Sequence, residues 1–273
     1  YRINSYLGMI IDTHCHLASK QFKGDLEDVI KNAESNKISK LISIGTDLED
    51  SKECIRIANI HDSVYATVGI HPCSVTDVGE KNWLQIISDL ANSNKVVAIG
   101  EIGLDFFHPA PSGWDEESYK KRQKDFFISQ LELAVDLGIN VVIHQRDKSD
   151  ECWNEIKKII APFKGKLRAV FHCFTHSWES AKPLINDGHL ISFTGVVTFK
   201  NASIVQECAS KCPDDSFMVE TDSPYLAPIP FRGKRCEPMY VKNTTEFIAD
   251  LRRTSLEKIS DSTSRNADSF FYF

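Results

Sequence analysis

Short apolar runs and longer amphipathic stretches alternate along most of the chain. The apolar runs are continuous, which is typical of strands buried on both faces of a parallel sheet. Eight runs of this kind end in polar or glycine residues, at 9–12, 40–45, 64–69, 96–100, 140–143, 168–171, 190–193 and 217–219. Apolar positions spaced as on one face of a helix predict helices between them, at 25–36, 50–60, 81–91, 116–137, 149–160, 178–186 and 202–210.

Eight strands that alternate with helices allow a closed (β/α)8 barrel or an open doubly wound sheet. No Gly-x-Gly-x-x-Gly turn follows the first strand, which argues against the dinucleotide-binding form of the open sheet. The strand count and the length of 273 residues favour the barrel, with further helices at 240–251 and 256–271. We therefore predict an α/β protein, a single-domain TIM barrel over 9–273. Residues 1–8 are expected to be an N-terminal extension, natural or left by cloning.

The net charge of −6 excludes a general polyanion-binding surface, so any nucleic acid must be held by a local basic patch. No segment approaches the ~20 apolar residues of a membrane span, so no membrane partner is expected. The eight cysteines form no Cys-x-x-Cys pair, and no secretion signal is evident at the start of the sequence. These features predict free thiols and a cytoplasmic or nuclear location.

Metal-ligand residue types cluster at the carboxyl ends of five predicted strands. They are His14, His16, Glu101, His144, His172 and Asp222. The carboxyl ends of barrel strands meet at one mouth, where barrel enzymes keep their chemistry. Residues two apart on a strand face the same side, so His14 and His16 are expected to face the axis and Cys15 the helices. A lone histidine at a strand end is more often a hydrogen-bonded core residue, but the joint pattern predicts a site for one or two divalent ions.

Other candidates divide by their place along the chain. His71 follows the third strand and has two interpretations, a substrate contact or a structural loop residue. For the four histidines on helices or other loops we expect no metal role: His61, His108, His176 and His189. Five basic residues follow strands five, seven and eight and are candidate phosphate contacts, although basic runs are usually solvated surface: Arg146, Lys200, Arg232, Lys234 and Arg235. So small a patch suits contact with the end of a nucleic-acid strand. The logarithm of the binding constant should then fall with the logarithm of the salt concentration with a slope of about 2–4 in magnitude.

Several motifs resemble the TatD family of metal-dependent deoxyribonucleases. They are Ile-Asp-Thr-His-Cys-His-Leu at 11–17, Gly-Ile-His-Pro at 69–72, Gly-Glu-Ile-Gly-Leu-Asp at 100–105, Ile-His-Gln-Arg-Asp at 143–147, His-Cys-Phe at 172–174 and Glu-Thr-Asp-Ser-Pro-Tyr-Leu-Ala-Pro at 220–228, with the basic stretch 232–238. The resemblance implies a TIM barrel of the amidohydrolase-like superfamily that hydrolyses DNA, often as a 3′→5′ exonuclease.

The resemblance also implies a ligand set. His14, His16 and Asp222 would hold one divalent ion, and His144 and His172 a second, with Glu101 bridging both. The cofactors would be two divalent ions, Mg, Mn or Zn. Five positions depart from the family pattern and put substrate preference in doubt: Cys73, where His or Glu often follows His-Pro, Gln145, His176, Phe231 and Cys236.

The predicted activity is metal-dependent hydrolysis of DNA from single strands or 3′ ends. Metal ions neutralise phosphate charge and activate a water, and we assign the catalytic roles to Asp222, as proton acceptor, and Glu101. One rival is an amidohydrolase-type hydrolase of a small amide or ester, although Glu101 stands where such enzymes carry a carboxylated lysine. The other rival is a non-catalytic metal-binding scaffold. No obligate protein partner is evident, and DNA-versus-RNA preference and polarity stay open.

Overall fold

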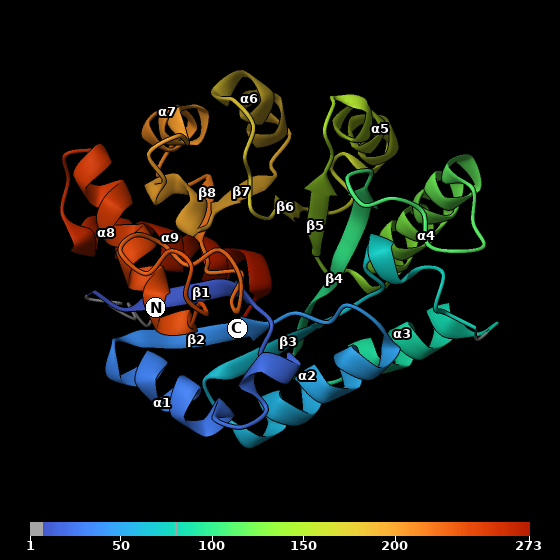
Figure 1. Ribbon diagram of the computed structural model, residues 1–273, viewed down its shortest axis with the longest axis horizontal. Helices are drawn as coiled ribbons and strands as arrows, with labels where there is room; N and C mark the ends of the chain where they lie inside the picture. The colour runs from blue at the N-terminus through green and yellow to red at the C-terminus, as the bar shows by residue number, and fades with distance from the viewer. Residues whose placement is uncertain (1–7, 80) are drawn as a thin grey trace.

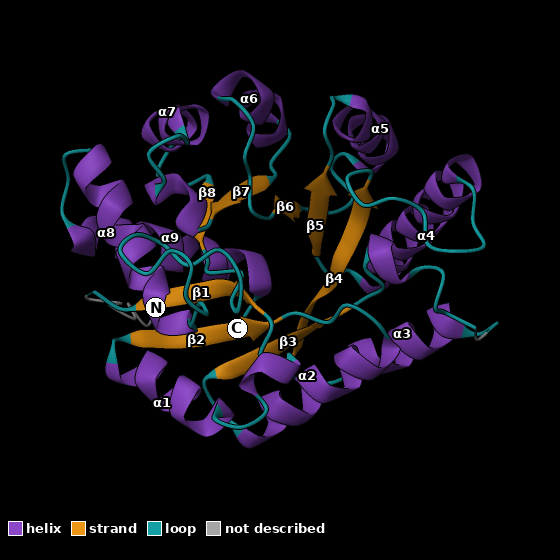
Figure 2. Cartoon of the chain, in the orientation of Figure 1, coloured by secondary structure: helices purple, strands orange, loops and turns teal. Residues whose placement is uncertain are grey.

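The computed structural model describes residues 8–79 and 81–273. Eight parallel strands form one sheet in sequence order. They are β1 (Ile10–Cys15), β2 (Ile38–Ser43), β3 (Val64–Val68), β4 (Val96–Asp105), β5 (Val141–Arg146), β6 (Ala169–Phe171), β7 (Leu190–Phe193) and β8 (Phe217–Val219). The strands curve into a ring with helices outside them (Figure 1, Figure 2). The predicted barrel is confirmed, whereas the expected extension lies outside the described residues except for Gly8.

Closure of the ring depends on a few contacts between its first and last segments. Cys15 and Ser223 form a parallel bridge just beyond β8. The His16 amide donates to the Ser223 carbonyl at 2.7 Å, and the Asp222 amide donates to the His14 carbonyl at 2.8 Å. These bonds bring the residues after β8 beside the end of β1, although most of the chain separates them.

Nine helices in the described part of the chain match the predicted ones to within two residues at each end. They are α1 (Leu26–Ser35), α2 (Leu48–Ile60), α3 (Trp83–Ala91), α4 (Glu116–Leu137), α5 (Glu151–Ile160), α6 (Trp178–Asn186), α7 (Ser203–Lys211), α8 (Val241–Leu251) and α9 (Leu256–Phe271). Local signals set these ends. The Asp115 carboxylate accepts the Ser118 amide at the start of α4, and Gly138, with φ 68°, ends that helix.

The core has two layers. Alternate strand residues such as Ile11, Ile42 and Val142 fill the barrel interior. The opposite strand faces, including Cys15, pack in the larger outer cluster with the helices, as predicted. Phe270 of α9 packs with the interior cluster, and its carbonyl accepts the Asn140 side-chain amide at 2.6 Å. Because Asn140 immediately precedes β5, α9 covers the amino ends of the strands, and the carboxyl ends form the mouth.

Three strands run further into the mouth than the apolar pattern predicts. β1 continues to Cys15, β4 to Asp105 and β5 to Arg146, so His14, Glu101 and His144 lie within strands rather than after them. Main-chain pairing of β4 with β5 extends over their polar residues, and hydrophobic periodicity does not predict such an extension. Gly103, with φ 138°, permits the close approach, because a Cβ at this position would clash with the His144 carbonyl.

All eight cysteines lie in the described part of the chain, and each is a free thiol, as predicted. Among the described residues, no helix has both the length and the apolar character that crossing a membrane requires.

Candidate metal centre

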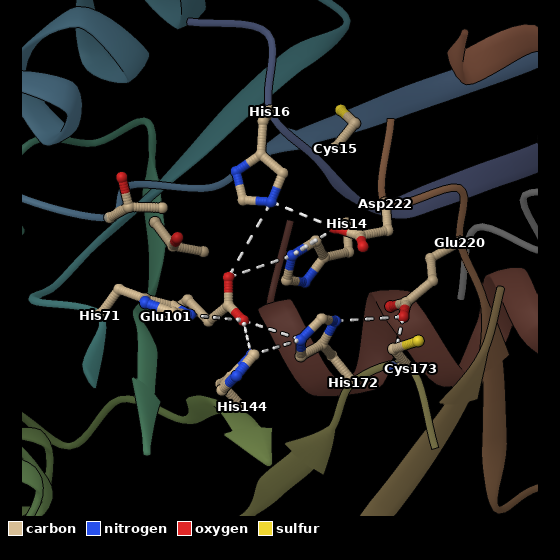
Figure 3. A network of polar contacts seen from close by, with 12 residues as sticks. His14, Cys15, His16, His71, Glu101, His144, His172, Cys173, Glu220 and Asp222 are labelled. Atoms are coloured by element: carbon tan, nitrogen blue, oxygen red, sulfur yellow. Dashed lines mark hydrogen bonds and ion pairs between the residues drawn. The ribbon is translucent and has the colours of Figure 1, made fainter. Parts of the chain in front are cut away.

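Six side chains predicted as ligands converge at the mouth, from five strands (Figure 3). Glu101 lies at their centre. Its Oε1 is 2.7 Å from Nδ1 of His144 and 2.7 Å from Nε2 of His172. Its Oε2 faces the other side of the cluster, 3.4 Å from Nε2 of His14 and 4.0 Å from Nε2 of His16. The two carboxylate oxygens therefore face two different pairs of imidazoles.

Asp222 lies on the His14 side of the cluster. Its Oδ1 is 3.2 Å from Nε2 of His16 and 3.6 Å from Nε2 of His14. His71 joins the opposite side, with Nε2 3.7 Å from Oε1 of Glu101 and its ring 4.4 Å from that of His144. Nδ1 of His71 accepts the Cys73 amide at 3.0 Å, so the geometry agrees with both interpretations of His71, a substrate contact and a structural loop residue.

One observation indicates that the side chains of this cluster suit divalent cations. His14 is fully buried, yet neither of its ring nitrogens makes a hydrogen bond. Buried polar atoms without partners are rare, and each costs about 1–3 kcal/mol. Imidazole nitrogens beside carboxylate oxygens are ligands that Zn²⁺, Mn²⁺ and related ions accept. Three groups in the cluster have donor atoms within 4.8 Å of one another: His14, His16 and Asp222; His14, Glu101 and His172; and His71, Glu101 and His144.

Electrostatics keep the carboxylates of the cluster ionised. Burial favours the neutral acid, but the imidazoles of His172 and His14 hold the pKa of Glu101 well below its ordinary value. Burial also opposes ionisation of Asp222, and the hydrogen bond from His16 together with the nearby imidazoles lowers its pKa. Burial lowers the pKa of His14, which leaves that imidazole neutral and able to act as a ligand. Two anionic carboxylates at the centre favour cation binding.

Sequence reasoning missed the carboxylates that support the cluster from behind. Oδ2 of Asp105 lies 3.1 Å from Nε2 of His144, and Oε1 of Glu220 lies 3.4 Å from Nδ1 of His172. Glu220 is itself held by the Cys173 amide and the Ser192 hydroxyl, both at 2.6 Å. Carboxylates commonly orient metal-binding imidazoles through the second ring nitrogen. Their position in the sequence could have indicated this role, because Asp105 stands in the same motif as Glu101, and Glu220 in the same motif as Asp222.

The predicted phosphate contacts divide into two groups. Four are exposed at the mouth: Arg146, Lys200, Arg232 and Lys234. The guanidinium of Arg146 lies 4.2 Å from the Phe107 ring, and that of Arg232 lies 4.2 Å from the Phe199 ring.

Arg235 has a different environment from the other four. Its Nη atoms donate to both carboxylate oxygens of Asp25, at 2.9 and 2.6 Å, and to Glu237 at 3.0 Å. Nη1 also donates to the Gln21 carbonyl at 2.8 Å. These acceptors occupy the guanidinium, which argues against the predicted phosphate contact and for a structural role.

Comparison with known proteins identifies the relatives of this chain. A family model described as TatD related DNase matches residues 11–272. The chain belongs to the TatD family of metal-dependent hydrolases. A Bacillus subtilis relative, named uncharacterized metal-dependent hydrolase YabD, is 38% identical over 263 residues, which cover 96% of this chain and 99% of YabD. The similarly named YcfH of Escherichia coli K12 is 31% identical over 266 residues, which cover 96% of each chain.

Solved structures agree with this membership of the TatD family. The crystal structure of YjjV, a TatD homologue from Escherichia coli K12, superposes with a TM-score of 0.85 at 27% identity and covers 98% of this chain and 99% of YjjV. A TatD family hydrolase from Entamoeba histolytica gives a TM-score of 0.84 at 21% identity, covering 97% and 98% of the two chains. At that identity the second match supports the fold alone.

Proposed function

We propose that this TatD-family protein hydrolyses phosphodiester bonds in DNA with two divalent cations at the mouth of the barrel. The observation that carries the proposal is the position of Glu101. One of its oxygens faces His144 and His172 at 2.7 Å, and the other faces His14 at 3.4 Å. A carboxylate that bridges two cations needs this two-sided arrangement, with separate ligands around each oxygen.

The ligands divide into two groups around this bridge. His14, His16 and Asp222 would hold one cation, His144 and His172 would hold the other, and Glu101 would contact both. When bound, divalent cations neutralise phosphate charge and make a water molecule acidic near neutral pH. Asp222 orients the attacking water and accepts its proton through Oδ1. Its side chain is 14% exposed against 3% for Glu101, so it is the better placed of the two carboxylates to meet a substrate.

The substrate is the end of a DNA strand, degraded in the 3′→5′ direction. A few exposed cations around the mouth, such as Arg146 and Arg232, suit contact with a small number of phosphates. The net charge of −6 disfavours a binding surface that follows a long stretch of duplex DNA, because such a surface would need many more phosphate contacts. His71 faces the same space beside Glu101 and His144, where it can hydrogen-bond the bound end.

The test is cleavage of single- and double-stranded DNA labelled at either end, with Mg²⁺, Mn²⁺ or Zn²⁺ added to the full chain. We expect stepwise shortening from the 3′ end with release of mononucleotides. Internal fragments would contradict the exonuclease assignment. Turnover of an amide or lactone panel without DNA cleavage would support the small-molecule hydrolase, and metal binding without any turnover would support the scaffold. The rate of cleavage of an RNA strand of the same sequence, compared with that of the DNA strand, gives the preference between deoxyribose and ribose.

A further inference from the structure

A second cluster of ligand-type side chains lies beside the metal centre. Cys73 is in the short 3-10 turn Pro72–Ser74 after β3, Asp105 ends β4, and His108 follows in the loop to α4. Nδ1 of His108 lies 2.9 Å from Oδ2 of Asp105 and 3.8 Å from Sγ of Cys73. One donor atom from each residue lies within 4.8 Å of the other two. The turn after β3, the end of β4 and the loop that follows β4 thus bring sulfur, oxygen and nitrogen donors together.

The spacing fits a tetrahedral ion. Zn²⁺ holds sulfur at about 2.3 Å and nitrogen or oxygen at about 2.0–2.1 Å, which places sulfur about 3.6 Å from nitrogen and nitrogen about 3.3 Å from oxygen. The corresponding distances here are 3.8 and 2.9 Å, so shifts of a few tenths of an ångström would complete the geometry. A thiolate ligand favours Zn²⁺ and similar borderline or soft ions over Mg²⁺ and Ca²⁺.

Asp105 is held firmly for this role. Its Oδ1 accepts the amides of Phe107 and His108, both at 3.0 Å, and Gln123 pairs with its main chain through bonds of 2.9 and 3.0 Å. These contacts fix the carboxylate and direct Oδ2 toward His108 and toward Nε2 of His144 at 3.1 Å. Oδ2 therefore lies between the second cluster and the main centre.

The cluster is open to solvent on one side. The side chain of His108 is 48% exposed, whereas that of Asp105 is 1% exposed. Three protein ligands with an open side match sites that keep a position for water or an external ligand, rather than closed structural sites with four protein ligands. Burial, together with the negative charge of Asp105, raises the pKa of Cys73 to about 12, so the free side chain is a protonated thiol and a bound cation must displace its proton.

We propose that Cys73, Asp105 and His108 form an additional binding site for a thiophilic divalent cation of the Zn²⁺ class. The site is distinct from the cluster around Glu101, and Asp105 connects the two through His144. Its sulfur ligand comes from one of the positions at which this sequence departs from the TatD pattern. The inference extends beyond the proposed DNA hydrolysis and does not depend on it.

Metal content of the full chain tests the proposal. Protein saturated with Zn²⁺ and then dialysed is analysed for zinc per chain, beside Cys73→Ser and His108→Ala. Cys208→Ala on α7 and His61→Ala after α2 are matched controls, and circular dichroism establishes that each variant folds. We expect wild type and controls to retain one more Zn²⁺ per chain than the two cluster variants. Equal zinc content in all five proteins would overturn the site.

Cobalt substitution identifies the sulfur ligand directly. Co²⁺ bound by a thiolate gives a charge-transfer absorption in the near ultraviolet, which we expect in wild type and Cys208→Ala and not in Cys73→Ser. Absence of the band from wild type, or its survival in Cys73→Ser, would contradict the assignment. Neither readout involves a substrate. A protein that binds the extra ion but leaves DNA intact would refute the proposed function alone, and the reverse result would refute this site alone.

Discussion

Nε2 of His16 lies 3.2 Å from Oδ1 of Asp222, although 206 positions separate the two residues in the chain. The contact exists because the segment after β8 returns beside β1, where Asp222 donates its amide to the His14 carbonyl at 2.8 Å. Asp222 adopts φ 57°, a left-handed conformation that costs a non-glycine residue about 1 kcal/mol or more. The position of this carboxylate therefore depends on closure of the barrel.

Replacement of Asp222 tests its proposed role as proton acceptor. Asp222→Asn keeps the size of the side chain but removes the negative charge and the basic oxygen. We expect the turnover number for DNA cleavage to fall about 10²–10⁴-fold, the usual contribution of a positioned general base. Steady-state kinetics at saturating metal give the turnover, and a thermal melt tests whether the fold is kept. Turnover within threefold of wild type would remove Asp222 from the mechanism.

Glu101, the proposed bridging carboxylate, should control metal binding. Glu101→Gln leaves a neutral amide among His14, His144 and His172, so it removes the charge that two cations would share. We expect the variant to retain at least one fewer divalent ion per chain and to lose activity by several orders of magnitude. Metal analysis after dialysis provides the measurement. Glu179→Gln, an exposed position on α6, is the matched control and should retain the wild-type metal content.

The basic residues after β8 should separate by role. Arg232→Ala and Lys234→Ala remove exposed cations, and we expect each to raise KM and to reduce the salt-dependence slope by about 1. Arg235→Ala removes the contacts with Asp25 and Glu237, and we expect it to lower stability by about 1 kcal/mol with little change in the slope. Binding measured across a salt series, with urea unfolding, distinguishes the two outcomes. A loss of slope in Arg235→Ala would restore it as a phosphate contact.

His71 should contribute to the pH dependence of stability. Burial, aided by repulsion from His144, lowers the pKa of His71 to about 3. Below pH ~6.5 the unfolded chain takes up a proton at this imidazole while the folded protein does not, so stability falls as pH falls toward 3. One such group contributes at most about 1.4 kcal/mol per pH unit.

The variant for this experiment is His71→Asn, whose side-chain oxygen can replace Nδ1 as acceptor of the Cys73 amide. Urea unfolding of both proteins in chelator, at pH 7 and pH 4.5, gives the comparison. The variant should lose less stability than wild type over this interval. Parallel losses in the two proteins would show that His71 does not titrate as its burial implies.

Much of the fold was accessible from the sequence. Hydrophobic periodicity and caps act locally, so α4 (Glu116–Leu137) and β7 (Leu190–Phe193) have the predicted bounds. The location of the cluster also followed from local information, because all strands of a parallel barrel point the same way. Polar residues that follow the apolar runs, such as Glu101 and His172, must then meet at one mouth, whatever the packing between the strands.

Tertiary structure alone decided the contacts between distant segments. The pairing of β4 with β5 carried both strands past their apolar runs and placed Asp105 between His144 and His108. The approach of the segment after β8 to that preceding α1 engaged Arg235 with Asp25, 210 positions away. Such partners are selected by backbone pairing and burial across the whole barrel. No local pattern of hydrophobic and polar residues reports them, because the free energy of each contact depends on side chains far away in the chain.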